Sequence, residues 1–329
     1  MNSVWFLMPS VAVATGGVNN CYRACAVAEE AGIEARVVSD SPYPHCDPPQ
    51  YSRYWVPTAS GSFDIPGISE GDILVQPDIY HQPVPVSKPV RRVLYVQNWS
   101  LMPEHMPWIR HVWTYGNWTH LTFCIESMAY RDYQPRDPLP GWRPAECDDT
   151  SGMVNKHKLK WSALTPYFDL DEFSPGENDP DRILMLSRRL PGVAEEMGRR
   201  HPGRVTAADN LSAAELRSLY RKVGIFVLPS AAEGLSFPVC EALLSGCAVV
   251  SWPCGAPEDF LIHGHSALMA RFGDVDGMVS LAGTLLGHRA EQQRLSSNGA
   301  RIVRSVYTRE RTRTEILLAY HAAMAMPAE

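Results

Sequence analysis

The sequence predicts an α/β protein built from two Rossmann-like domains, and three observations support this class. The chain has 329 residues, about the length of two domains that each hold a core. Short apolar runs typical of buried parallel strands alternate with stretches typical of helices. Such a strand opens each half of the chain, at Val4–Met8 and again at Arg182–Leu186. The first is followed by a predicted helix over residues 18–31 and a strand over 33–38, which completes a βαβ unit.

The composition is that of an ordinary globular protein. Hydrophobic residues make up 45% and charged residues 20%, and the net charge of −6 argues against nucleic acid as the main partner. No apolar stretch approaches the roughly 18–20 residues that a transmembrane helix needs. The apolar N-terminus carries Ala12-Val13-Ala14, which mimics a signal-peptidase site. A first strand followed by a glycine loop is the better interpretation. We therefore expect a cytoplasmic protein, and we leave open peripheral contact with the inner face of a membrane.

Arginines gather near the C-terminus, between Arg301 and Arg313. Glu310 and Glu315 interrupt them, so we interpret the run as a solvated helix face rather than a patch for anionic membranes. The eight cysteines include no C-x-x-C pair. They are expected to be small buried side chains in a reducing compartment.

The stretch Pro229–Glu258 is the centre of the functional argument. The apolar run Gly224–Leu228 before it predicts a buried strand, and Pro238 is well placed as the first residue of a helix. A strand at Ala248–Trp252 follows. This order puts Gly234, Leu235 and Ser236 at a helix N-terminus, where unbonded backbone N–H groups suit an anion such as a diphosphate.

Two carboxylates flank this anion site. Glu233 lies in the loop and Glu241 in the predicted helix. A carboxylate accepts charge-assisted hydrogen bonds from sugar hydroxyls, each worth about 1.5–3 kcal/mol. The arrangement is typical of a cradle for a nucleotide sugar, with Glu241 on the ribose diol and Glu233 on the transferred sugar. The alternative is that Glu241 only complements the helix dipole.

The stretch as a whole resembles the E-x7-E signature of the retaining glycosyltransferases of GT-B fold, in particular family four. The matching positions are Pro229, Ser230, Glu233, Gly234, Pro238, Glu241, Ala242, Gly246, Val249, Val250, Gly255 and Glu258. The resemblance implies two Rossmann-like domains that face each other across a cleft. It also implies transfer of a sugar from a nucleoside diphosphate donor to an acceptor hydroxyl, with retention at the anomeric carbon and without a metal or a cofactor. The acceptor would be a glycan, a lipid-linked molecule or a small molecule in carbohydrate biosynthesis.

The resemblance extends to the N-terminal half. A glycine pair, Gly16-Gly17, stands at the entrance of the first helix without the spacing of a dinucleotide fingerprint. The resemblance implies contact with the donor phosphates, and the alternative is a tight turn that needs glycine. Gln97 follows the predicted strand Val93–Val96, where members of the family often carry a catalytic histidine. Glutamine can hydrogen-bond a hydroxyl but cannot become cationic.

Two arginines follow the strand that opens the second half. Members of the family carry an arginine at this strand end and a lysine about five residues on, and both neutralise the leaving diphosphate. Arg188 fits the arginine, with Arg189 a close rival, but residues 190–194 hold no cation. We expect Arg189 to replace the missing charge.

We expect three segments: an acceptor-side domain over 1–166, a nucleotide-sugar-binding domain over 167–306, and a helix over 307–329 that crosses back to the first domain. Ser41–Gly61 is expected to be a long loop without helix or strand, and residues 121–125 a strand. Asp169-x-Asp171 spells the D-x-D of metal-dependent glycosyltransferases, but its place in the linker favours a chance match.

Two other functions stay open. One is a catalytically weakened protein of the same fold that binds a sugar nucleotide or acts as a scaffold, motivated by the missing lysine and the short second domain. The other is a Rossmann dehydrogenase, which the absence of a G-x-G-x-x-G fingerprint disfavours.

Overall fold

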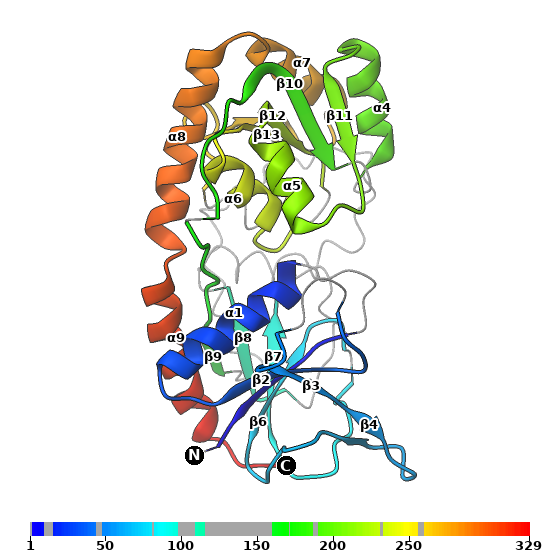
Figure 1. The fold of residues 1–329 in the computed structure, drawn as a ribbon, viewed down its shortest axis with the longest axis vertical. Coiled ribbons are helices and arrows are strands. Elements are labelled where there is room, and N and C mark those ends of the chain that lie inside the picture. The colour runs from blue at the N-terminus through cyan, green and yellow to red at the C-terminus, as the bar shows by residue number, and fades with distance from the viewer. Residues whose placement is uncertain are drawn as a thin grey trace. The chain divides into compact units, whose positions relative to one another are not determined.

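The computed structural model describes residues 2–9, 16–43, 48–80, 82–97, 109–115, 160–170, 172–186, 190–230, 233–255 and 260–329. They divide into two α/β units (Figure 1). The N-terminal domain holds the described residues up to Phe168 together with Tyr307–Glu329, and the C-terminal domain holds those of Asp169–Val306. The chain therefore passes between the domains at 168/169 and at 306/307, whereas the sequence predicts the first boundary at 166/167.

The N-terminal domain is built on a parallel sheet of seven strands in the order β3-β2-β1-β6-β7-β8-β9. The strands are β1 (Val4–Leu7), β2 (Ala35–Ser39), β3 (Ser52–Tyr54), β6 (Ile73–Pro77), β7 (Arg91–Val96), β8 (His111–Thr114) and β9 (Lys160–Ala163). Consecutive strands run outward in both directions from β1, which is the topology of a doubly wound domain. The carboxyl ends of β1 and β7 therefore lie on the same edge of the sheet.

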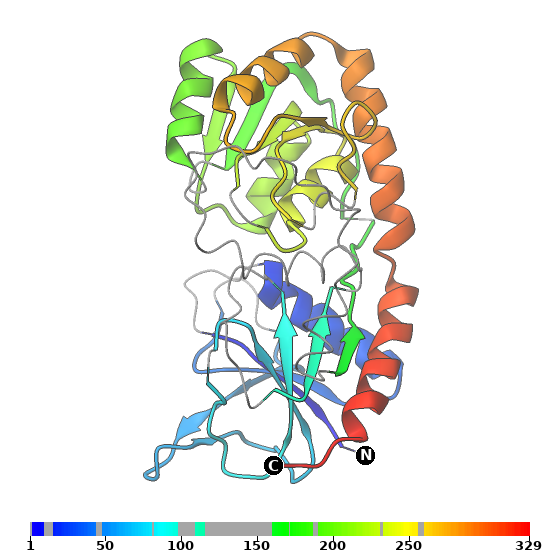
Figure 2. The same ribbon diagram turned by 180° about the vertical axis from the view of Figure 1, so that it is seen from behind.

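Helix α9 (Arg309–Met324) completes this domain, although it follows the C-terminal domain in the sequence. It packs against α1 (Gly16–Glu30) and against β9, as the red and blue helices of Figure 1 and the view from behind in Figure 2 show. Arg309 forms an ion pair with Glu30 at the end of α1. At the domain boundary the Phe168 N–H donates to the Tyr307 carbonyl at 3.3 Å, and the two rings lie edge to face at 5.9 Å. The two points at which the chain passes between the domains are thus joined by a hydrogen bond and a ring contact.

The sequence-based account of this domain is wrong at several places. The segment Ser41–Gly61 is not a loop throughout, because it contains β3 and the strand β4 (Val56–Pro57), which pairs with β5 (Phe63–Asp64). Strands β4 and β5 have two residues each, which is too short for a strand pattern to be recognisable in the sequence. Strands β8 and β9 were also not predicted. The predicted strand over 121–125 lies outside the described residues.

The C-terminal domain has a five-stranded parallel sheet in the order β11-β10-β12-β13-β14. The strands are β10 (Asp179–Leu186), β11 (Val205–Ala208), β12 (Val223–Leu228), β13 (Ala248–Ser251) and β14 (Leu268–Met269). All six residues of β12 are buried. The order changes direction between β10 and β12, and such a switch point is where ligands of open α/β sheets bind.

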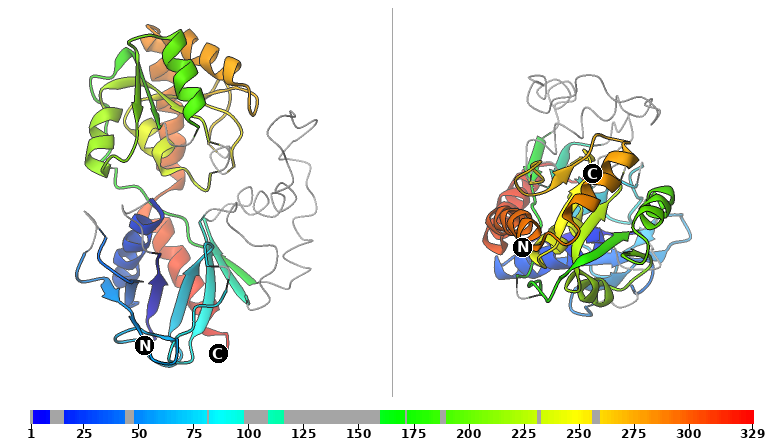
Figure 3. Two further views of the ribbon diagram at one scale, coloured as in Figure 1. Left: turned by 90° about the vertical axis from the view of Figure 1, so that its right-hand side faces the viewer. Right: turned by 90° about the horizontal axis from the view of Figure 1, so that it is seen from above.

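Five helices cover this sheet: α4 (Pro191–Arg200), α5 (Ala213–Tyr220), α6 (Phe237–Leu244), α7 (Val275–Leu285) and α8 (Arg289–Val306). Helices α5 and α6 lie in front of the strands in Figure 1, and α7 lies in front of them in the view from behind, while Figure 3 shows the same layers from the side. Ser212 and Glu215 form a reciprocal capping box at the start of α5. The two-domain, parallel α/β class that the sequence predicts is confirmed.

Among the helices described above, none has both the length and the apolar composition that crossing a membrane requires.

We predict opposite effects of alanine at two glycines of the C-terminal domain. A Cβ at Gly224 would collide with the Gln292 side-chain oxygen and lie 2.9 Å from the Asp179 carbonyl, whereas a Cβ at Gly198 would meet nothing within 4 Å. Gly224→Ala should lower the free energy of unfolding by about 1–3 kcal/mol because the core is overpacked. Gly198→Ala, within α4, should raise it by about 0.5–1 kcal/mol. Urea denaturation of both variants checks this, and a neutral Gly224→Ala would contradict the packing.

Candidate functional site

The loop that follows β12 is held to the loop that follows β13. The Glu233 N–H donates to the Cys254 carbonyl at 2.7 Å, and Glu233 forms a parallel bridge with Gly255. The bridge extends the parallel pairing of β12 and β13 beyond the ends of both strands. Glu233 is therefore fixed at the carboxyl edge of the sheet, next to the switch point between β10 and β12.

Trp252 secures the same loop from the other side. Its indole Nε1–H donates to the Ser230 carbonyl at 2.6 Å, and the ring is only 2% exposed. The Ser251 hydroxyl donates to the Leu228 carbonyl at 3.2 Å. These two residues were not assigned a role from the sequence, since nothing in an apolar strand end indicates which carbonyl its side chains will reach.

Ser236 has an unusual backbone conformation at the start of α6. Its φ and ψ are +57° and +74°, in the left-handed region, whereas residues at this helix position ordinarily have extended angles. Among the described residues the only other non-glycine with positive φ is Asn210, a residue type that tolerates it. The Ser236 hydroxyl is buried and has no hydrogen-bond partner in the described part of the chain. Strain of this kind is maintained only where the surroundings enforce it, and it is concentrated at binding sites.

The two glutamates differ in their surroundings. Glu233 is 4% exposed in its loop, whereas Glu241 is half-buried on α6. Burial, and then the nearby charge of Glu241, raise the pKa of the Tyr220 phenol and of the Cys240 thiol well above their usual ranges. Both groups therefore stay neutral near Glu241.

A second group of predicted residues comes together in the N-terminal domain, at the end of β7 and the start of α1. The Gln97 amide donates to the Gly17 carbonyl at 3.2 Å and lies 3.5 Å from the Cys21 sulfur. The Gln97 backbone N–H donates to the Asp78 carboxylate at 2.9 Å, and Asp78 is 2% exposed. A Cβ on Gly17 would collide with the Gln97 side-chain oxygen. A side chain at residue 17 would therefore require the Gln97 amide to move out of the space that it occupies.

The structure thus distributes the predicted site over two domains. Glu233, Gly234, Leu235 and Ser236 share one loop and Glu241 follows on α6, whereas Gly16, Gly17 and Gln97 meet in the N-terminal domain. Arg188 and Arg189 lie outside the described residues. They follow β10, which ends at Leu186 and is the parallel neighbour of β12.

Within the described part of the chain, no three side chains of His, Cys, Asp or Glu are grouped so that they could hold a metal ion. Of the linker acids, Asp169 is described and Asp171 is not.

Residues 186–288 match the sequence family described as "Glycosyl transferases group 1". The MMP α-(1→4)-mannosyltransferase of Mycolicibacterium hassiacum is 32% identical over 122 residues, which are 37% of this chain and 30% of that protein. The 2-deoxystreptamine N-acetyl-D-glucosaminyltransferase of Niallia circulans is 29% identical over 113 residues, 29% of either chain. The alignments thus span about 30% of the length of these curated relatives.

Solved structures agree over nearly the whole chain. The sucrose-phosphate synthase of Thermosynechococcus elongatus superposes with a TM-score of 0.63 at 11% identity, covering 99% of this chain and 100% of that one. HepE of Anabaena, solved in complex with UDP and glucose, gives 0.65 at 12% identity over 98% and 100% of the two chains. The chain therefore has the GT-B fold. With the match of residues 186–288, these findings support a glycosyltransferase family of that fold.

We predict that Gly17 and Gln97 are energetically coupled. Gly17→Ala alone should lower the melting temperature, because the new methyl group would collide with the Gln97 side chain. In a Gln97→Ala background the same methyl group has room, so Gly17→Ala should cost at least about 1 kcal/mol less there. A thermal double-mutant cycle measures the difference, and additive effects would show that the two side chains do not compete for the same space.

Proposed function

We propose that this protein is a retaining glycosyltransferase of family four, which moves a sugar from a nucleoside diphosphate to an acceptor hydroxyl. The observation that carries the proposal is the loop from Glu233 to Ser236. It presents a buried carboxylate and a buried, unpartnered Ser236 hydroxyl beside the N-terminus of α6, at the edge of the sheet where α/β ligands bind. The similarity of residues 186–288 to glycosyl transferases supports the same assignment.

The proposal assigns separate roles to the two glutamates. Glu241, half-buried on α6, binds the ribose diol of the donor. Glu233, held in the loop by its hydrogen bond to Cys254, binds hydroxyls of the transferred sugar. The backbone N–H groups at Gly234–Ser236 bind the diphosphate between them.

The site has to stabilise the negative charge of the departing diphosphate. Negative charge grows on the diphosphate as the glycosidic bond breaks, and fixed donors aimed at that charge lower the barrier. The proposal gives this task to the start of α6, to Arg188 and Arg189, and to the Gly16-Gly17 loop. Attack by the acceptor on the face that the diphosphate leaves gives retention, and no carboxylate nucleophile is needed.

The proposal gives Gln97 a structural role beside its contact with the sugar. Its amide N–H groups are directed to the Gly17 carbonyl and the Cys21 sulfur, so the side chain supports the start of α1. The side-chain oxygen remains the atom with which Gln97 can accept a bond from a sugar hydroxyl.

One observation favours a second function. Residues 190–194, where the resemblance calls for a lysine, form the start of α4 and contain no cation. A protein weakened in this way would bind a sugar nucleotide without transferring the sugar. Release of diphosphate in the presence of donor discriminates the two, since a binder releases none.

The first experiment identifies the sugar donor. A thermal-shift panel of nucleoside diphosphate sugars, begun with UDP and GDP donors, should show one that raises the melting temperature. Ligand at about 100 times its dissociation constant adds about 2.7 kcal/mol. The acceptors to be tried with that donor are glycans, lipid-linked molecules and small molecules. A panel without any shift would contradict the proposed function.

We predict different binding defects for the two glutamates. Glu241→Ala should weaken both the bare nucleoside diphosphate and the full donor by at least about tenfold, because a hydrogen bond to a charged group contributes about 1.5–3 kcal/mol. Glu233→Gln should leave the bare diphosphate within about twofold and reduce turnover. Calorimetry with each ligand measures this, and unchanged melting temperatures exclude misfolding as the cause. Equal losses in both variants would refute the division of roles.

We also predict that transfer needs no divalent metal. The proposed neutralising groups are backbone N–H groups and arginines, whereas metal-dependent enzymes use a cation held by acids. Activity in excess chelator should stay within about twofold of activity in magnesium or manganese. Loss of activity on chelation, restored by manganese and abolished by Asp171→Ala, would instead identify the linker acids as the donor site.

A further inference from the structure

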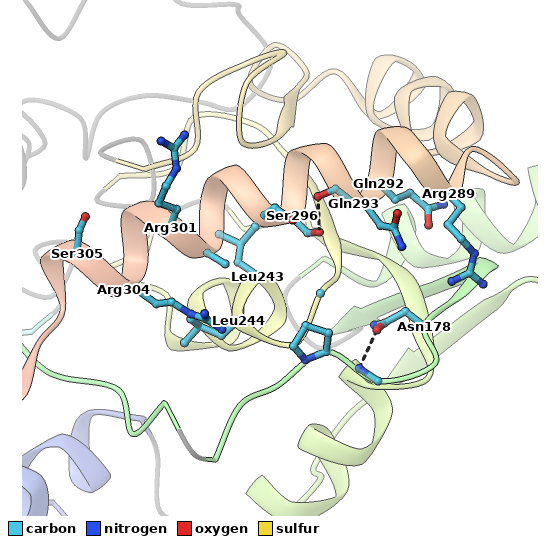
Figure 4. A pocket seen from close by; sticks show the side chains of 15 residues that line it. Asn178, Leu243, Leu244, Arg289, Gln292, Gln293, Ser296, Arg301, Arg304 and Ser305 are labelled. Carbon is cyan, nitrogen blue, oxygen red and sulfur yellow. Dashed lines mark hydrogen bonds between the residues drawn. The ribbon is translucent and has the colours of Figure 1, made fainter.

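A pocket of about 720 Å³ lies in the C-terminal domain at the end of α6 opposite to Ser236 (Figure 4). It is formed by α8, by the last residues of α6 and by the segment 175–178. Leu243 and Leu244 of α6 line it, and no residue of the Glu233 loop does. It is therefore separate from the candidate donor site.

The pocket is positively charged. Arg289, Arg301 and Arg304 line it, and none of the residues that line it is acidic, although the exposed Glu177 stands between the lining residues Gly176 and Asn178 in the chain. This concentration of cations stands out because the chain as a whole has a net charge of −6. Local cationic walls around a hollow focus the field and attract anions.

These arginines differ from others on the same surface. Arg294, also on α8, forms an ion pair with Glu291 at 2.6 Å, and Arg309 pairs with Glu30. Within the described part of the chain, the side chains of Arg289 and Arg304 make no hydrogen bond or ion pair, and the Arg301 side chain donates to Asn298. The pocket thus brings together three arginines for which no acidic partner lies among the described residues. The sequence alone indicated only a solvated helix face.

The spacing of the two outer arginines limits the ligand. Arg289 and Arg304 lie on one helix about 22 Å apart along its axis, so a single small anion cannot bind both guanidinium groups. In Figure 4 both side chains leave α8 toward the side where Asn178 is drawn, whereas Arg301 leaves it in the opposite direction. Gln293 and Ser297 line the pocket between them and can donate hydrogen bonds. A ligand with several anionic groups fits this order of cation, neutral donors and cation.

A lipid surface does not fit this pocket. The large apolar side chains that the described residues expose are Val56, Ile79, Leu170, Ile262 and Leu318, and none of them lines it. Membrane-binding surfaces combine basic residues with exposed apolar ones. The volume lies within the range of about 300–1,000 Å³ that small-molecule sites have.

We propose that this pocket binds a small molecule with two or more phosphate groups. Arg304 binds the phosphate at one end and Arg289 the phosphate at the other, since a guanidinium group matches phosphate oxygens with two parallel hydrogen bonds. Arg301 adds positive charge at the rim. The proposal does not depend on the proposed glycosyl transfer.

Calorimetry of the whole chain at low ionic strength tests the proposal, with an inorganic linear polyphosphate long enough to reach from Arg289 to Arg304 as the probe. The unmodified protein should bind it saturably. Arg289→Ala and Arg304→Ala should each weaken binding by at least about tenfold, because hydrogen bonds to charged groups contribute about 1.5–3 kcal/mol. Arg304→Glu should abolish binding. The matched control is Arg294→Ala, which removes an arginine of the same helix outside the pocket and should change the affinity less than about twofold.

Four outcomes would overturn the proposal. They are absence of saturable binding, binding that the pocket variants leave unchanged, an equal loss in Arg294→Ala, and tighter binding of a glutamate-rich peptide than of the polyphosphate. The second would direct the anion to the loop at Ser236, the third would indicate a general effect of charge, and the fourth would identify a protein-binding groove. All three arginines are exposed, so the variants should keep the parent melting temperature.

Discussion

The hydrogen bond from the Glu233 N–H to the Cys254 carbonyl is the constraint on which the candidate donor site depends. It belongs to a parallel bridge between Glu233 and Gly255, which joins the segments that follow the buried strands β12 and β13. The Trp252 indole fixes the intervening backbone at Ser230. Since the loop is bonded on both sides, it can keep Ser236 in a left-handed conformation that a serine in a mobile loop would leave. The loop from Glu233 to Ser236, which is proposed to bind the donor, is therefore held in place by the sheet.

In the N-terminal domain, side-chain hydrogen bonds hold the candidate site residues in place. Asp78 holds the backbone of Gln97, and Gln97 in turn holds the Gly17 carbonyl. Residues 17, 78 and 97 come from three separate parts of the chain, and each lies near the carboxyl edge of the sheet. The Gln97 amide thus has a structural task, which is to support the start of α1.

The sequence was sufficient for the fold class because the strands that define it are short apolar runs. Gly224–Leu228 and Val4–Met8 are recognisable without a structure, and β12 and β1 are buried throughout. It was insufficient for β11, of which only Ala208 is buried, and for the first three residues of β10, which are exposed or half-exposed and precede the predicted strand Arg182–Leu186. The backbone angles of Ser236 and the contact of Gln97 with Gly17 depend on residues distant in the chain, so no local pattern carries them. The charge pattern on α8 was visible, but the pocket that makes it significant arises only when α6 packs against that helix.

The bond between Phe168 and Tyr307 has a consequence for how the protein is made. All of the C-terminal domain is inserted between these two residues, so it leaves the ribosome before α9 does. Helix α9 covers α1 and β9, and the N-terminal domain has to wait for it with that apolar surface exposed to water. The domain that is synthesised first is therefore the one completed last. Chaperones that recognise exposed apolar surface would meet it during the translation of about 140 residues of the other domain, an interval of about 7–28 seconds at about 5–20 residues per second.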